Sequence, residues 1–96
     1  MGKSQLIYYL KQEIRHKYLM ELRIHKVEDK RYSDGVKYSL LLIEMKTGNK
    51  VLMDNHYPKG HHFHLNNNEF PYRYENESRL IDDFKNLILQ HFGEKI

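Results

Sequence analysis

The apolar residues near the amino terminus recur first at helical spacing and then at every second position. Four of them follow Ser4, a residue type that often caps helices: Leu6, Ile7, Leu10 and Ile14. This spacing predicts a short amphipathic helix over residues 5–15. From residue 18 onward, apolar residues occupy every second position and mostly polar residues lie between them. The apolar positions are Tyr18, Met20, Leu22 and Ile24. Such alternation predicts a strand with one buried face.

The middle of the chain predicts an antiparallel hairpin. Residues 36–45 place apolar side chains on both faces of an extended segment, which is typical of a strand in the interior of a sheet. Gly48 and Asn49 then favour a tight turn into residues 50–54. The strands on either side of this turn should therefore be neighbours.

The carboxyl-terminal third predicts short strands followed by a helix. Pro58 and Gly60 indicate a loop, residues 61–65 a short strand, residues 66–68 a turn, and residues 70–74 a further extended segment. Six apolar residues then form one helical stripe: Leu80, Ile81, Phe84, Leu87, Ile88 and Phe92. Asn76 or Ser78 can cap this helix, and Gly93 should end it.

These elements predict an α+β fold in a single domain spanning residues 1–96. We expect a meander of about four antiparallel strands, a short helix before it, and a carboxyl-terminal helix packed on one face of the sheet. Its composition is that of a globular protein, with 40% hydrophobic and 30% charged residues. With no cysteine, stability must come from packing or from a partner, so a homo-oligomer is one possibility.

The charge is concentrated at one end of the chain. Residues 1–32 carry eight Lys and Arg against four Asp and Glu, whereas residues 65–96 carry four against six. A basic segment that also contains tyrosines suits RNA, because cations neutralise phosphates and aromatic rings stack on bases; it is equally typical of a solvated surface. With no long apolar run and no signal-peptide pattern, we expect a cytoplasmic protein that does not enter a membrane.

Side chains that can take part in acid–base chemistry or metal binding are concentrated in residues 54–64, where histidines are frequent. Four of the seven fall within nine residues, behind the carboxylate of Asp54: His56, His61, His62 and His64. Imidazoles change charge near neutral pH, so such a group can transfer protons, bind a metal or contact a phosphate. If residues 62–64 are extended, His62 and His64 share one face and His61 lies on the other.

This region resembles a known toxin family. The resemblance rests on Asp54-Asn55-His56 followed at short spacing by His62-x-His64, within a hairpin and helix arrangement that covers most of residues 18–92. It is similar to the TumE-like toxins of bacterial and archaeal type II toxin–antitoxin systems. The resemblance implies a small toxin that acts on RNA and is encoded beside an antitoxin of the helix-turn-helix type.

Chemistry suggests roles for the individual residues. RNA cleavage without a metal cofactor needs a base, an acid and cations near the phosphate. We expect Asp54, His56, His62 and His64 to line one site, with His56 and His64 as the acid–base pair and Asp54 orienting one imidazole. Lys59 in the loop and Arg23 on the polar face of the first strand are the candidate RNA contacts.

Three other interpretations fit the same residues. Asp-Asn before a Pro-Gly loop is ordinary turn chemistry, and histidines often occupy half-exposed sheet positions. His-x-His with a nearby carboxylate could hold zinc, nickel or manganese, although the spacing matches no strong metal signature. The chain could also be a non-catalytic module that binds nucleic acid or protein.

Overall fold

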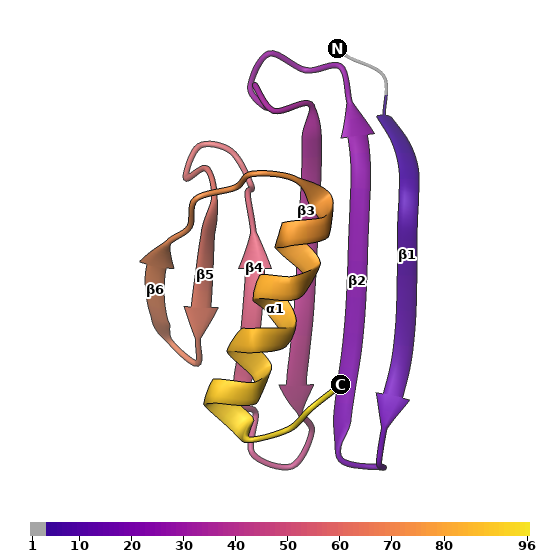
Figure 1. The fold of residues 1–96 in the computed structure, drawn as a ribbon, viewed down its shortest axis with the longest axis vertical. Helices are drawn as coiled ribbons and strands as arrows, with labels where there is room; N and C mark the ends of the chain where they lie inside the picture. Colours follow the sequence, from indigo (N-terminus) through magenta and orange to yellow (C-terminus); the bar gives the residue numbers. More distant parts are fainter. Residues whose placement is uncertain (1–3) are drawn as a thin grey trace.

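The computed structural model describes residues 4–96, which form one antiparallel sheet and one helix (Figure 1). The six strands lie side by side in chain order, so every connection joins neighbours. The elements are β1 (Ser4–Ile14), β2 (Tyr18–Val27), β3 (Val36–Glu44), β4 (Lys50–Asp54), β5 (His62–Leu65), β6 (Asn68–Pro71) and α1 (Glu77–Phe92). The predicted antiparallel meander, its central strand and the carboxyl-terminal helix are confirmed.

The predicted amino-terminal helix is wrong, and the sheet has six strands where about four were expected. Residues 4–14 form β1, which pairs with β2 along its whole length. Leu10 and Ile14 are four positions apart, a spacing that places two side chains on one face of a helix and equally on one face of a strand. The register shift between Leu6 and Tyr8 further obscures the period-two pattern.

Helix α1 begins and ends as its sequence predicts. The side chain of Asn76 caps it, because its Oδ1 accepts a hydrogen bond from the backbone N–H of Arg79 at 2.8 Å. Gly93 follows the last turn with φ of 70°, a left-handed conformation that glycine adopts without strain. Leu80, Phe84 and Ile88 are buried against the sheet.

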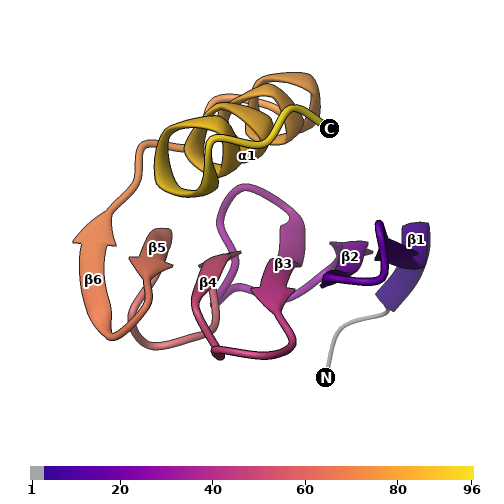
Figure 2. The ribbon, with the colours of Figure 1, turned by 90° about the horizontal axis from the view of Figure 1, so that it is seen from below.

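The hydrophobic core lies between α1 and one face of the sheet (Figure 2). Alternation along the strands supplies its sheet side: Tyr18, Met20, Leu22, Ile24, Val36, Tyr38, Leu40, Leu42, Val51 and Met53. These side chains are almost completely excluded from water, and their burial is the main stabilising contribution to this small fold. The helix is thereby fixed to a single side of the sheet.

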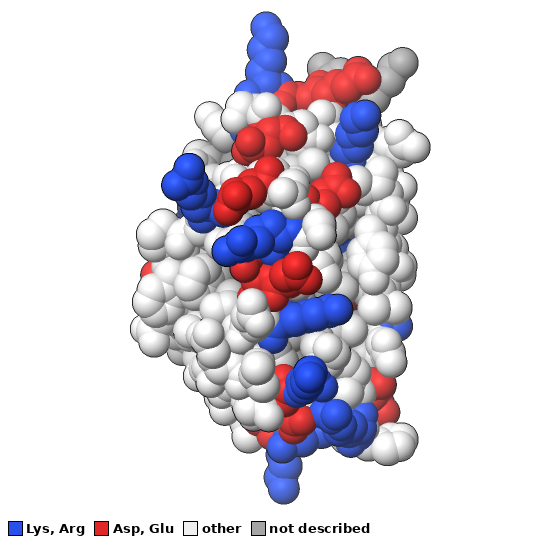
Figure 3. Space-filling model, in the orientation of Figure 1, with Lys and Arg blue, Asp and Glu red and all other residues white. Residues whose placement is uncertain are grey.

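The opposite side of the sheet, which we call the open face, is covered by no helix or strand of residues 4–96 (Figure 2). Its residues alternate with those of the core, so the polar positions of β2 to β5 point to this side. The helix-bearing side carries interspersed charges of both signs (Figure 3). Within the described part of the chain, no helix is long and apolar enough to cross a membrane.

Candidate functional site

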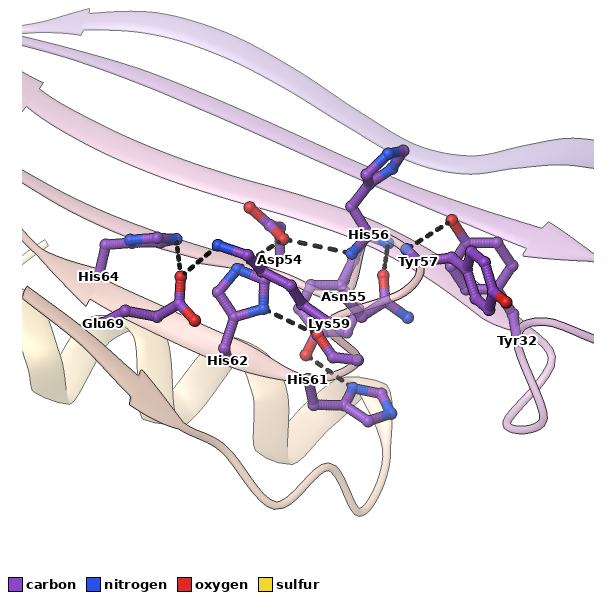
Figure 4. A network of polar contacts seen from close by, with 12 residues as sticks. Tyr32, Asp54, Asn55, His56, Tyr57, Lys59, His61, His62, His64 and Glu69 are labelled. Carbon is purple, nitrogen blue, oxygen red and sulfur yellow. Dashed lines mark hydrogen bonds and ion pairs between the residues drawn. The ribbon is translucent and has the colours of Figure 1, made fainter.

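Three of the predicted site residues meet on the open face. Asp54 ends β4 directly opposite His62 of β5, and His64 follows on the same side of β5. One nitrogen of each imidazole and one carboxylate oxygen of Asp54 all lie within 4.8 Å of one another (Figure 4). We call these three residues the Asp–His cluster.

His62 is the buried member of the Asp–His cluster, with 6% of its side chain exposed. Its Nδ1–H donates a hydrogen bond to the backbone carbonyl of Gly60 at 2.8 Å, since a carbonyl oxygen can only accept. Its Nε2 lies 3.0 Å from Oδ1 of Asp54. In the charged ring this nitrogen donates to Asp54, and in the neutral ring it presents a lone pair at the same place.

His64 lies beside an ion pair that sequence reasoning did not foresee. Its Nε2 is 3.7 Å from Oε1 of Glu69, which lies opposite it on β6. The Lys59 ammonium donates to the same oxygen at 2.8 Å, which lowers the pKa of Glu69 and raises that of Lys59. The rings of His62 and His64 meet edge to face, with centroids 4.8 Å apart. Lys59 therefore lies beside the Asp–His cluster, where its ammonium forms an ion pair with Glu69.

The structure does not bring the side chain of His56 into this cluster. His56 is exposed and points away from Asp54, although its backbone N–H donates to Oδ1 of Asp54 at 3.2 Å (Figure 4). Its side chain instead lines a separate pocket of about 240 Å³ together with Arg31 and Tyr57. The chain leaves the strand geometry after Asp54, so alternation no longer determines which side His56 faces.

Asn55 explains why the chain turns at this point. It is buried, and its Oδ1 accepts from the backbone N–H of Tyr38 at 2.9 Å. Its Nδ2 donates to the carbonyl of Val36 at 2.8 Å. The amide of Asn55 thus continues the hydrogen bonding of β4 to β3 for one further step, and it fixes Asp54 at the end of the strand. The Asp-Asn pair was the signal in the sequence, but it indicated only a turn.

His61 directly precedes β5 and faces the side opposite to His62, as alternation predicts. Its ring contacts three residues from other parts of the chain: Tyr38, Asp34 and Tyr74. Its Nδ1 accepts from the Tyr38 hydroxyl at 2.8 Å, and its Nε2–H donates to Asp34 at 2.6 Å. Burial raises the pKa of Tyr38, so this phenol remains a donor. The rings of His61, Tyr38 and Tyr74 pack together in a triangle: the centroid of His61 lies 5.6 Å from that of Tyr38 and 5.0 Å from that of Tyr74, and the two tyrosine centroids are 5.9 Å apart. These contacts hold the start of β5, and with it His62.

Arg23 lies in line with the Asp–His cluster across the sheet. Successive strand pairs place five residues in one row, which we call the cross-strand row: Tyr9, Arg23, Ser39, Asp54 and His62. At the strand spacing of about 4.8 Å, four steps span roughly 19 Å.

At the β1 end of this row, a charged side chain, Arg23, packs on an aromatic ring, that of Tyr9. The Arg23 guanidinium lies 5.4 Å from the centroid of the Tyr9 ring and donates to Glu21 at 3.2 Å, which lowers the pKa of Glu21. A groove of about 500 Å³, lined in part by Arg23, Lys37 and Ser39, runs beside it. The open face therefore carries a groove lined by Arg23, Lys37 and Glu21, and Ser39 at this groove lies opposite Asp54 of the Asp–His cluster.

Comparison with protein-family models, with curated proteins and with solved structures finds no match for this chain.

Proposed function

We propose that this protein is an RNA-cleaving toxin of a type II toxin–antitoxin system, with RNA bound on the open face. The observation that carries the proposal is the convergence of Asp54, His62 and His64 at one end of the cross-strand row. This arrangement puts two imidazoles and a carboxylate on the same face as Lys59, Arg23 and Lys37, and metal-independent cleavage of RNA requires an acid, a base and cations near the phosphate. The resemblance of the histidine segment to TumE-like toxins supplies the biological context.

In this proposal the acid–base roles fall to His64 and His62, the two imidazoles of the Asp–His cluster. His64 is the more accessible ring, with 20% of its side chain exposed, and acts as the base that takes the proton of a ribose 2′-hydroxyl. The 2′-oxygen attacks phosphorus, and the bond from phosphorus to the 5′-oxygen breaks. The charged His62 gives its Nε2 proton, which Asp54 accepts as a hydrogen bond before RNA binds, to the leaving 5′-oxygen, while the Nδ1–H bond to Gly60 keeps the ring oriented. The products are a 2′,3′-cyclic phosphate and a 5′-hydroxyl.

Two cations serve different phosphates in this proposal. Lys59 lies at the cluster, where the negative charge on the reacting phosphate would draw its ammonium away from Glu69. Arg23 is two strands from Asp54 in the cross-strand row, or about 10 Å, so it contacts a neighbouring phosphate. His56, with its side chain outside the cluster, takes no part in the proton transfers.

A toxin of this kind needs an inhibitor in the same compartment. The proposed partner is the product of an adjacent gene, an antitoxin of the helix-turn-helix type, and the proposed compartment is the cytoplasm, where both it and RNA are present. Co-expression of the neighbouring open reading frame should relieve growth inhibition by this chain. A neighbouring frame that gives no relief would argue against the toxin assignment.

Cleavage of a mixed RNA pool by antitoxin-free protein tests the catalytic assignment. His64→Gln and Asp54→Asn should each lower the rate on the order of a hundred- to ten-thousand-fold, because each removes a group that moves or positions a proton. His16→Gln is the matched control, since that ring is 97% exposed in the β1–β2 turn, and it should cleave like the wild type. His56→Gln should cost less than about tenfold.

Thermal melts of each variant separate a catalytic loss from unfolding. Wild-type rates in His64→Gln would exclude this residue as the base. A folded wild type that cleaves no RNA would refute the nuclease, and the open face would then be a binding surface alone.

A further inference from the structure

We infer that Asp54, His62 and His64 also form a binding site for a divalent transition-metal ion, with Zn²⁺ as the best match. The site offers two imidazole nitrogens and one carboxylate oxygen from adjacent strands. Two imidazoles favour zinc and its first-row neighbours over Mg²⁺ and Ca²⁺, which prefer oxygen ligands. Binding of the ion requires no RNA cleavage, so the site stands independently of the proposed function.

Contacts behind the ligands orient them as in known metal sites. A metal-binding histidine usually donates its second ring N–H to a carbonyl or carboxylate, and the Nδ1–H of His62 donates in this way to Gly60. This hydrogen bond leaves Nε2 of His62 as the ligand atom and aims it at Asp54. The carboxylate is held in turn by the backbone N–H of His56 at 3.2 Å.

The ligand atoms are close to the separations that zinc needs. Bonds of about 2.0–2.2 Å in a tetrahedron place ligand atoms roughly 3.3 Å apart. Nε2 of His62 and Oδ1 of Asp54 are already 3.0 Å apart, and all three ligand atoms lie within 4.8 Å, so only the nitrogen of His64 has to move closer for all three to bind one ion. The side chains are between 6% and 20% exposed, which shelters the ion and leaves a path for its entry.

A second carboxylate, which would be a fourth ligand, lies at the edge of the site and is held by a cation. Oε1 of Glu69 is 3.7 Å from Nε2 of His64 and 2.8 Å from the Lys59 ammonium. Lys59 therefore both occupies a possible fourth ligand and repels an arriving ion. Removing this ammonium in Lys59→Met should tighten metal binding, because the repulsion is lost and Glu69 is free to bind the ion.

The ion would inhibit the reaction proposed above, a consequence that rests on the proposed function. Zn²⁺ takes the nitrogen lone pair that His64 uses as a base. It also displaces the Nε2 proton that His62 gives to the leaving oxygen, and that proton is released to solvent. Metal and proton thus compete for the same two atoms.

Titration of the purified full chain with Zn²⁺ and Co²⁺, without RNA, tests the site directly. Calorimetry in two buffers of different ionisation heat should show one ion bound per chain with release of protons, and Co²⁺ should give the visible absorption of a tetrahedral complex. His64→Gln should weaken binding by at least about tenfold, His16→Gln should leave it unchanged, and Lys59→Met should strengthen it. Equal binding to wild type and His64→Gln, or none to either, overturns the inference.

RNA cleavage followed during the Zn²⁺ titration distinguishes the site from the proposed function. Cleavage that falls in proportion to metal occupancy supports both. Metal binding by a wild type that cleaves no RNA, with or without metal, supports the site and refutes the nuclease. Cleavage that rises with occupancy overturns the inhibitory role, because the ion would then be part of the reaction.

Discussion

At the scale of single residues, the histidine segment separates side chains that lie on the open face from side chains that hold the backbone. Alternation along an extended segment was enough to predict that His62 and His64 share a face that His61 does not. It could not place His56, because the chain leaves β4 one residue earlier. The side chain of Asn55 fixes the point at which the chain leaves β4, through two hydrogen bonds to β3. Such contacts between distant residues produce no periodic pattern in the sequence, so they could not be predicted from it.

Asn55→Ala should destabilise the fold by about 2–6 kcal/mol. The substitution leaves the N–H of Tyr38 and the carbonyl of Val36 without these partners in a buried position, and each unsatisfied group costs about 1–3 kcal/mol. Asn67→Ala is the control, because Asn67 is exposed in the β5–β6 turn and should change stability by less than about 0.5 kcal/mol. Urea denaturation measures both, and equal stabilities would show that Asn55 does not hold this turn.

At the scale of elements, strong local patterns were predictive and ambiguous ones were not. The β3–β4 hairpin has Gly48 and Asn49 at its turn, and α1 has a cap, an apolar stripe and a terminal glycine, so both were predicted. The β1–β2 hairpin turns through Arg15 and His16, which have φ of 53° and 52°. Neither is a residue type typical of such turns, so the sequence gives no sign that residues 4–14 fold back on β2 as a strand.

His16→Gly should stabilise the protein by about 0.5–1 kcal/mol. Both turn residues adopt the left-handed conformation, which costs a non-glycine residue roughly 1–2 kcal/mol, while glycine loses part of that gain through the greater freedom of the unfolded chain. The His16 ring contributes little in return, since it is almost fully exposed. Thermal unfolding should shift upward by about 2–8 °C.

His16→Ala controls for loss of the ring, because alanine keeps the unfavourable conformation and should give no such rise. A glycine variant that melts at or below the wild-type temperature would mean that this turn is not strained.

At the scale of the whole molecule, one helix on one side of a six-stranded sheet divides the protein into two unlike surfaces. The helix-bearing side holds the core and carries mixed charges (Figure 3). The open face carries the cross-strand row, the groove beside it and the Asp–His cluster. This division follows from pairing between strands that are distant in sequence, so local patterns predicted the layers but not which side chains face each other.

RNA affinity should depend on the open face and not on the helix. In a His64→Gln background that prevents cleavage, Arg23→Gln and Lys37→Gln should each weaken binding and reduce the salt slope by about 0.7, since each releases one counterion less from single-stranded RNA. Tyr9→Leu should weaken binding by roughly 1–3 kcal/mol at an unchanged slope, because a stacking contact releases no counterion.

Lys85→Gln, on the exposed side of α1, is the control of equal charge change and should leave both affinity and slope unaltered. Fluorescence anisotropy with a short labelled RNA at four salt concentrations gives both quantities for every variant. If Lys85→Gln weakens binding as much as Arg23→Gln does, RNA lies on the helix side. In that case the cross-strand row would not be the surface that delivers RNA to His62 and His64, because those rings face the opposite side of the sheet from α1.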